Sequence, residues 1–248
     1  MFDITVGGYP GSMSQHSNAR LQSDLSRLER ETEQYLSTVE SFHDDEFTEP
    51  SLCEGWSRAD VVAHVAVVSR RLVRLINWAQ TGTEQAPYDS QEERSALIAE
   101  TAGLPAAQLK VEARAAIRHF LDNAQRLTGT LAVDQLALGP KTFAPHQLPG
   151  VMVAEIILHH ADLDTQWEIE EADPDSVLDA LEAAVRTMQV KDAPGMTIVT
   201  DERDEWVIGD GALRVEGDRE GILPWLARGD AENIYLPEGA QAPQLPTW

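Results

Sequence analysis

One apolar helical segment of the chain carries two polar side chains that need a partner. The stretch VMVAEIILHHAD runs from Val151 to Asp162, with Glu155 and His159 four residues apart. At 3.6 residues per turn, such side chains lie about 40° apart on the same face of a helix. Burying a carboxylate and an imidazole costs free energy unless each is hydrogen-bonded, charge-paired or bound to a metal. The fold must therefore bring a partner to this helix.

Three further long helical patterns precede this segment, each with apolar residues at helical spacing. Ser57 and Asp60 form a capping pattern at the start of the second one. Four helices of this length, joined by loops, predict a four-helix bundle over residues 16–172. The four patterns cover about residues 18–42, 61–79, 91–127 (broken at 103–105) and 151–167. Residues 128–150, rich in glycine and proline, are expected to form an irregular loop.

The composition changes after residue 172. A shorter helix is expected over residues 176–189, followed by period-two patterns in MTIVTDE and EWVIGDGALRVEG. The Gly-Asp-Gly turn within the second pattern predicts a hairpin, and REGILPWLARGD predicts a short helix. The fold class is therefore α+β, with the bundle followed by a small α+β domain over residues 173–248. Residues 1–15 are interpreted as a leader or an added segment, with the natural start at Met13.

Charge and cysteine content exclude several classes of function. The chain has 42 acidic and 19 basic residues and a formal charge of −23, which argues against nucleic acid or an anionic membrane as a partner. The single cysteine, Cys53, cannot form an intrachain disulfide and is consistent with a reducing cytoplasm. We find no run of 18 apolar residues and no signal-peptide pattern at the N-terminus. Nothing marks a subunit interface, so a monomer is compatible with the sequence.

A third polar residue, His64, lies in the apolar first half of the second helix. Carboxylate and histidine ligands that face inward from different helices are a usual way for a bundle to hold a metal. His64, Glu155 and His159 would leave a fourth position open, which suits catalytic zinc, although iron, nickel or cobalt accept the same ligands. His160 points about 140° away from Glu155, whereas Asp162 can orient His159 as a hydrogen-bond acceptor.

Spacing alone leaves simpler interpretations open. His64 can be a hydrogen-bonded core histidine, and Glu155 with His159 can form a simple acid–imidazole pair. Asp60 fits a helix cap better than a partner for His64. Cys53 is a candidate nucleophile, but no partner lies near it in the sequence.

Three segments resemble one known family. PSLCEGWSRADVVAHVA (Pro50–Ala66) is similar to the start of the second helix in the DinB-like, mycothiol-dependent maleylpyruvate isomerase family, where Gly-Trp-Ser/Thr is followed by Ala-His-Val/Leu. AEIILHHADL (Ala154–Leu163) resembles the Glu-x-x-x-His helix of that family, and GILPWLARGD resembles the end of its small C-terminal domain. The superfamily often uses three histidines, and Glu155 resembles the isomerase branch in this respect.

The resemblance implies a function. It implies zinc held by His64, Glu155 and His159, mycothiol as the coenzyme, and cis–trans isomerisation of maleylpyruvate to fumarylpyruvate in gentisate-type aromatic degradation. The partners would be this small-molecule substrate and the low-molecular-weight thiol, in the cytoplasm. Two alternatives remain: a metal-dependent mycothiol S-transferase acting on electrophiles, and a metal-binding module without turnover.

A substrate with two carboxylates needs a cationic anchor. Arg228, within the family-like WLARGD, is the first candidate for that anchor or for direct catalytic assistance. Arg214 and Arg219 are alternatives, and each of the three can also be an ordinary surface arginine.

Overall fold

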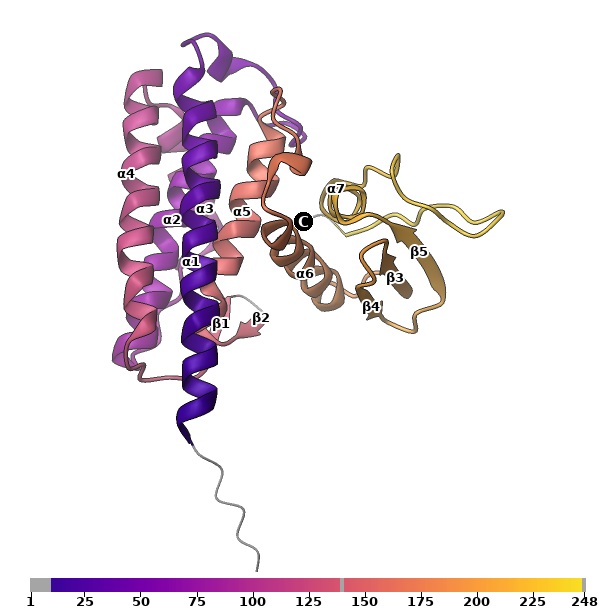
Figure 1. The fold of residues 1–248 in the computed structure, drawn as a ribbon. Helices are drawn as coiled ribbons and strands as arrows, with labels where there is room; N and C mark the ends of the chain where they lie inside the picture. The colour runs from indigo at the N-terminus through magenta and orange to yellow at the C-terminus, as the bar shows by residue number, and fades with distance from the viewer. Residues whose placement is uncertain (1–9, 139–140, 247–248) are drawn as a thin grey trace, which may run out of the picture.

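The chain folds into an antiparallel helical bundle with a smaller mixed part attached to one side. The computed structural model describes residues 10–138 and 141–246 (Figure 1). Helices α1 and α2 each pack against both α4 and α5, which confirms the predicted four-helix bundle. A further helix, α3, packs on the outside of α2. The bounds of these helices are α1 Pro10–Ser41, α2 Arg58–Thr81, α3 Gln91–Ala102, α4 Ala106–Ala124 and α5 Leu148–Asp162.

The capping pattern at the second helix is confirmed. The Ser57 side chain accepts a hydrogen bond from the Asp60 backbone N–H, and the Asp60 carboxylate accepts from the Ser57 N–H at 2.9 Å. Asp60 is therefore a capping residue, as its spacing indicated. The helix ends at Gly82, whose φ of +75° is the left-handed conformation typical of a helix C-terminus.

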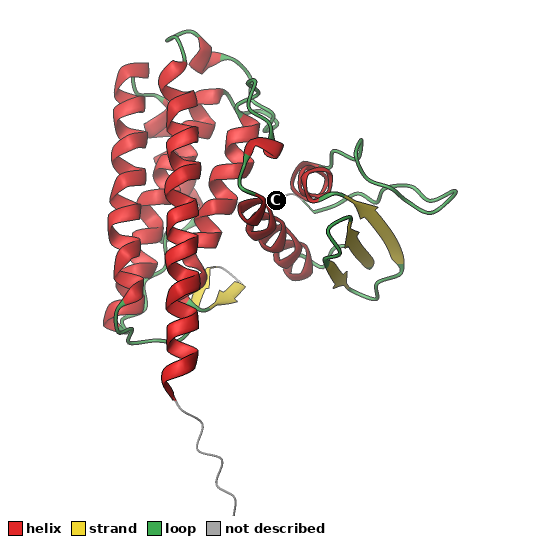
Figure 2. Ribbon diagram, viewed as in Figure 1, coloured by secondary structure: helices red, strands yellow, loops and turns green. Residues whose placement is uncertain are grey.

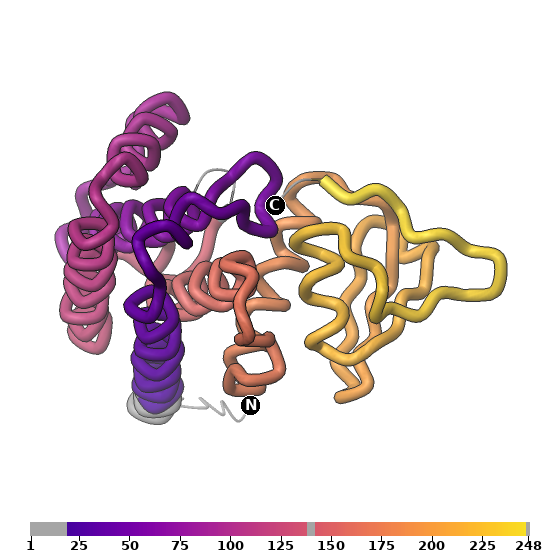
Figure 3. Tube along the Cα trace, turned by 90° about the horizontal axis from the view of Figure 1, so that it is seen from above, coloured from indigo at the N-terminus to yellow at the C-terminus, as the bar shows by residue number. Residues whose placement is uncertain are grey.

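The C-terminal part is α+β, as predicted. Helix α6 packs on α5, helix α7 packs on α6, and a three-stranded sheet lies beyond them (Figures 1 and 2). Seen from above, α6 stands between the bundle and the sheet (Figure 3). One continuous apolar core includes buried residues from α1 to α7. The bounds of these elements are α6 Pro174–Val190, β3 Met196–Thr200, β4 Glu205–Ile208, β5 Leu213–Gly217 and α7 Arg219–Arg228.

The predicted hairpin around the Gly-Asp-Gly turn is wrong. The strand order is β4-β3-β5, with β3 antiparallel to β4 and parallel to β5. The chain leaves β4 at Ile208, crosses the start of β3, and enters β5 on the other side. A Cβ atom at Gly195, the residue before β3, would lie 1.7 Å from Asp210 Oδ1. The crossing therefore requires a glycine at position 195 as well as the Gly-Asp-Gly turn.

Two other expectations differ from the structure. The loop before α5 contains a short antiparallel hairpin, β1 (Leu136–Leu138) with β2 (Lys141–Phe143). Helix α5 ends at Asp162 and not at Trp167, because Asp164 has a left-handed φ of +52°. The Arg58 guanidinium, which is 9% exposed as a residue, donates to the Leu163 and Asp164 carbonyls and so holds this helix end.

The proposed boundaries at the N-terminus and at residue 173 stay predictions. Residues 10–15 of the segment interpreted as a leader form the first turns of α1, and residues 1–9 lie outside the described part. Within the described ranges, no helix is both long enough and apolar enough to cross a membrane.

A buried charge cluster fixes α6 against the bundle. Arg27 of α1 is 8% exposed, and its Nη2 lies 2.9 Å from Asp24 and 2.5 Å from Asp179 of α6.

Replacing Arg27 with Met would leave two carboxylates without their cation, which costs roughly 3–5 kcal/mol of unfolding free energy. Urea unfolding measures the loss. Arg30→Met is the control: its side chain is 55% exposed in a pair with Asp173, and such pairs contribute about 0–1 kcal/mol. Equal losses in the two variants would contradict this account of α6.

Candidate metal centre

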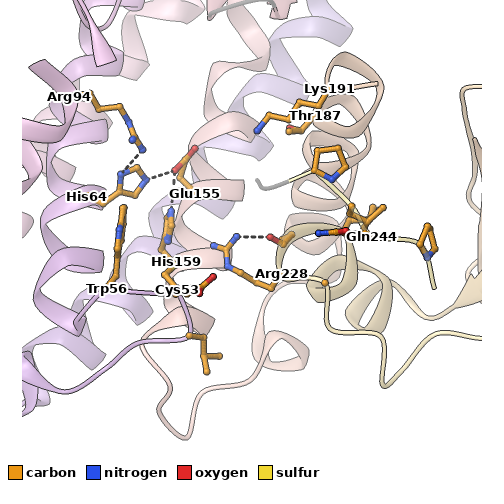
Figure 4. Close-up of a pocket in the computed structure, with 18 residues that line it drawn as sticks. Cys53, Trp56, His64, Arg94, Glu155, His159, Thr187, Lys191, Arg228 and Gln244 are labelled. Carbon is orange, nitrogen blue, oxygen red and sulfur yellow. Dashed lines mark hydrogen bonds and ion pairs between the residues drawn. The ribbon is translucent and has the colours of Figure 1, made fainter. Parts of the chain in front are cut away.

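The three predicted ligand residues lie together where α2 faces α5. His64 Nε2 is 3.1 Å from Glu155 Oε2, and His159 Nε2 is 3.5 Å from the same oxygen (Figure 4). Ligand atoms of the three residues all lie within 4.8 Å of one another. The four-residue spacing on α5 places Glu155 and His159 on one face, and the apolar packing of α2 directs His64 towards them.

Burial and hydrogen bonding set the charges of these groups. Burial, reinforced by nearby His159, lowers the pKa of His64 to about 4. Burial would raise the pKa of Glu155, but hydrogen bonds with His159 and His64 hold it well below its usual range. The site therefore presents one anionic and two imidazole donors, a set that suits a divalent ion such as zinc.

Asp162 connects this cluster to the C-terminal part. Its Oδ2 lies 2.8 Å from His159 Nδ1, and its two oxygens accept from Arg228 Nε at 2.8 Å and Nη2 at 2.5 Å. Despite burial, hydrogen bonds from Arg228 and His159 hold the pKa of Asp162 well below its usual range. Burial lowers the pKa of His159, but its hydrogen bonds, first of all that with Asp162, raise it well above 6.5. Asp162 thus orients a metal-ligand candidate and an arginine together.

Two residues that contact the cluster, Arg94 and Trp56, were not predicted as site residues from the sequence. Arg94 of α3 places Nη2 3.2 Å from His64 Nδ1. The Trp56 ring lies 5.4 Å from the His64 ring and stacks at 6.5 Å on His159. Trp56 belongs to the family-like Gly-Trp-Ser segment, but its position in the sequence alone did not indicate a role at the site. No spacing pattern could have assigned Arg94, because it reaches the site only through the packing of α3 on α2.

The cluster opens into a cavity of about 790 Å³ between the bundle and the C-terminal part. Its walls come from the loop before α2, from α6 and α7, and from the C-terminal tail. Three cationic residues line it, although the whole chain is strongly acidic: Arg94, Lys191 and Arg228. A cavity of this size with a few convergent polar groups is typical of a small-molecule site.

The three arginines considered as substrate anchors differ in their positions relative to the cavity. Arg228 lines the cavity, with its side chain 22% exposed. Arg214 lies on β5 in an exposed pair with Glu216. Arg219 donates to Asp204 at 2.7 Å and is likewise not among the residues lining the cavity. Of the three, only Arg228 reaches this cavity.

Cys53 and His160 also take definite places. Cys53 lines the cavity, and its sulfur lies within 4.8 Å of ligand atoms of His159 and Asp162. The cysteine therefore has the histidine neighbour that the sequence did not supply. His160 points away from the cavity: its Nε2 is 2.7 Å from Thr38 Oγ1, and its ring stacks on Trp167 at 3.9 Å.

The donor set fits a metal better at one of two possible clusters. Cys53, His159 and Asp162 also bring ligand atoms together, but His159 Nδ1 and both Asp162 oxygens are already hydrogen-bonded. In the cluster of His64, Glu155 and His159, both Nε2 atoms lie within 3.5 Å of the same Glu155 oxygen. That convergence, with Asp162 behind one imidazole, is the usual arrangement of a metal site.

Comparisons with known proteins agree with the motifs. The family described as mycothiol maleylpyruvate isomerase N-terminal domain matches residues 28–164, more than half of the chain. Two solved structures share the fold over 92% of this chain and 97% of theirs. One is the mycothiol-dependent maleylpyruvate isomerase (25% identity, TM-score 0.79) and the other is a histidine-to-alanine mutant of the mycothiol-dependent maleylpyruvate isomerase (24% identity, TM-score 0.80). No curated protein sequence gives a significant match.

Metal content tests the ligand residues. We expect gently purified protein to hold roughly one divalent ion per chain. His64→Ala and the double variant Glu155→Ala/His159→Ala should each lose it, because they remove ligands from a three-residue set. The measurement is elemental analysis by mass spectrometry. His119→Ala, at an exposed position of α4, is the matched control and should keep the ion. Full occupancy in the double variant would refute the ligand assignment.

Buried His160 should make stability depend on pH. Burial lowers the pKa of His160 from 6.5 to about 3, so the folded chain binds fewer protons than the unfolded chain between these values. The unfolding free energy therefore falls as the pH drops below 6.5, by up to about 1.4 kcal/mol per pH unit for this group. Urea unfolding from pH 4 to 7 measures the slope. His160→Asn should be less stable at pH 7 but show a shallower slope, and an unchanged slope would contradict the prediction.

Proposed function

Because the chain belongs to the mycothiol maleylpyruvate isomerase N-terminal domain family, we propose that it is a cis–trans isomerase that converts maleylpyruvate to fumarylpyruvate. Mycothiol would be the coenzyme and zinc the metal at His64, Glu155 and His159. The observation that carries this proposal is a single cavity lined by both this ligand set and Arg228. A cytoplasmic location, expected from the single cysteine, belongs to the same proposal.

The metal and the thiol would have distinct chemical tasks. A bound divalent ion supplies Lewis acidity, which lowers the pKa of a thiol or water and polarises a carbonyl. Mycothiol supplies a nucleophilic thiolate, the reagent that turns an electron-poor double bond transiently into a rotatable single bond. The cavity of about 790 Å³ has room for a coenzyme beside a small substrate.

The protein's own residues would bind and orient the substrate. The guanidinium of Arg228 is a fork that matches a carboxylate, and Asp162 fixes its orientation through two hydrogen bonds. Asp162 also holds the His159 proton at Nδ1, which leaves Nε2 directed at Glu155. One carboxylate thereby sets the geometry of the anchor and of the ligand together.

The experiment supplies maleylpyruvate to the purified holoprotein with and without mycothiol. The enol-pyruvate absorbance should fall only when the thiol is present, and NMR should identify the trans product. Arg228→Ala should lower kcat/KM by about 10²–10³, as for loss of one positioned charge donor. Arg214→Ala, at an exposed arginine outside the cavity, should leave activity unchanged. Absence of thiol-dependent turnover would reject the isomerase.

The same experiment distinguishes the isomerase from its closest alternative, a mycothiol S-transferase. A mycothiol S-transferase would use this cavity and these residues, but it would release the thiol joined to the electrophile. Accumulation of such a conjugate, with consumption of one thiol per substrate, would favour the transferase over the isomerase. Catalytic amounts of thiol that suffice for complete conversion would favour the isomerase.

A further inference from the structure

The two histidines of the site differ at Nδ1, which donates a hydrogen bond in His159 and accepts one in His64. His159 Nδ1 faces the Asp162 carboxylate at 2.8 Å, and an ionised carboxylate only accepts hydrogen bonds, so the proton is at Nδ1. His64 Nδ1 instead faces Arg94 Nη2 at 3.2 Å. A guanidinium only donates, so His64 Nδ1 accepts and the proton of the neutral ring is at Nε2. That Nε2 lies 3.1 Å from Glu155 Oε2, an acceptor.

Only one of these arrangements is compatible with binding a metal through Nε2. A neutral histidine that ligates through Nε2 needs its lone pair there and its proton at Nδ1. Asp162 enforces this form in His159, but Arg94 enforces the opposite form in His64. With the proton at His64 Nδ1, two donors would face each other across the 3.2 Å contact. The hydrogen bond from Arg94 and ligation by His64 Nε2 therefore exclude each other.

Arg94 has a second possible use in the same cavity. Among the residues that the structure describes, it makes no ion pair with a carboxylate, whereas Arg228 is bound at both oxygens of Asp162. Both arginines line the cavity. A guanidinium that leaves His64 can bind an anionic ligand there, and a planar carboxylate matches its fork.

We propose that Arg94 couples the binding of a dicarboxylate to the binding of the metal. In the metal-free site Arg94 donates to His64 and opposes ligation, and a carboxylate of the ligand draws it away and frees His64. Linkage requires the effect to be reciprocal, so metal and dicarboxylate each raise the affinity for the other. This inference rests on the metal ligands proposed above, but not on the isomerase reaction.

Zinc titration of the metal-free chain, in competition with a chelator, tests the coupling. Maleate serves as the dicarboxylate probe. For the wild-type chain, saturating maleate should tighten the zinc Kd by about 5–150-fold, the usual range of such coupling. For Arg94→Ala, zinc should bind about 10-fold tighter than to the wild type without maleate, since a charge-assisted hydrogen bond no longer opposes it, and maleate should add little. Arg74→Ala, which removes an arginine of α2 outside the cavity, should behave as the wild type.

The outcomes separate the coupling from the metal site. Equal tightening by maleate in the wild type and Arg94→Ala would overturn the coupling alone, as would a wild type that shows none. A wild-type chain that binds zinc no better than His64→Ala would overturn the metal ligands and the coupling together. Circular dichroism and thermal melting of each variant confirm that differences in Kd arise in folded protein.

Discussion

The carboxylate of Asp162 is the contact on which the site depends. It stands at the end of α5, is 1% exposed, and binds His159 on one side and Arg228 on the other. A buried carboxylate is tolerated only when it is paired and hydrogen-bonded, and these two partners satisfy it. Further contacts run from His159 through Glu155 and the neutral His64 ring to Arg94. The sequence of contacts is Arg228, Asp162, His159, Glu155, His64 and Arg94.

This network explains why a second, smaller part is attached to the bundle. The bundle alone supplies the ligands, but the Arg228 partner of Asp162 comes from α7, which reaches the site because α6 packs on α5 and α7 packs on α6. The Arg27 cluster holds α6 against α1, and the Arg58 contacts hold the end of α5. Loss of either contact would move Arg228 relative to the metal-ligand residues. The buried ion pairs therefore determine position more than they add stability.

The sequence was most informative where a residue's role follows from local geometry. Helical periodicity identified the bundle, the capping pattern identified the start of α2, and the four-residue spacing of Glu155 and His159 gave a shared face. It failed where distant segments decide the structure. The parallel pairing of β5 with β3 depends on a close approach of Asp210 to Gly195, and the end of α5 depends on Arg58. Arg94 was missed for the same reason, since only tertiary packing brings it to His64.

The chain as a whole is strongly acidic, whereas three cationic residues line the cavity. The charge close to a bound ligand matters more for binding than the charge of the whole chain. A formal charge of −23 repels anions at long range, but salt screens interactions between exposed charges beyond about 8–10 Å. Within the cavity, by contrast, the guanidinium groups of Arg94 and Arg228 act on a ligand at contact distance. Arg94 and Arg228 lie at opposite ends of the contact network, on either side of the ligand residues. The proposed coupling relies on this placement, because a dicarboxylate offers one group to each guanidinium.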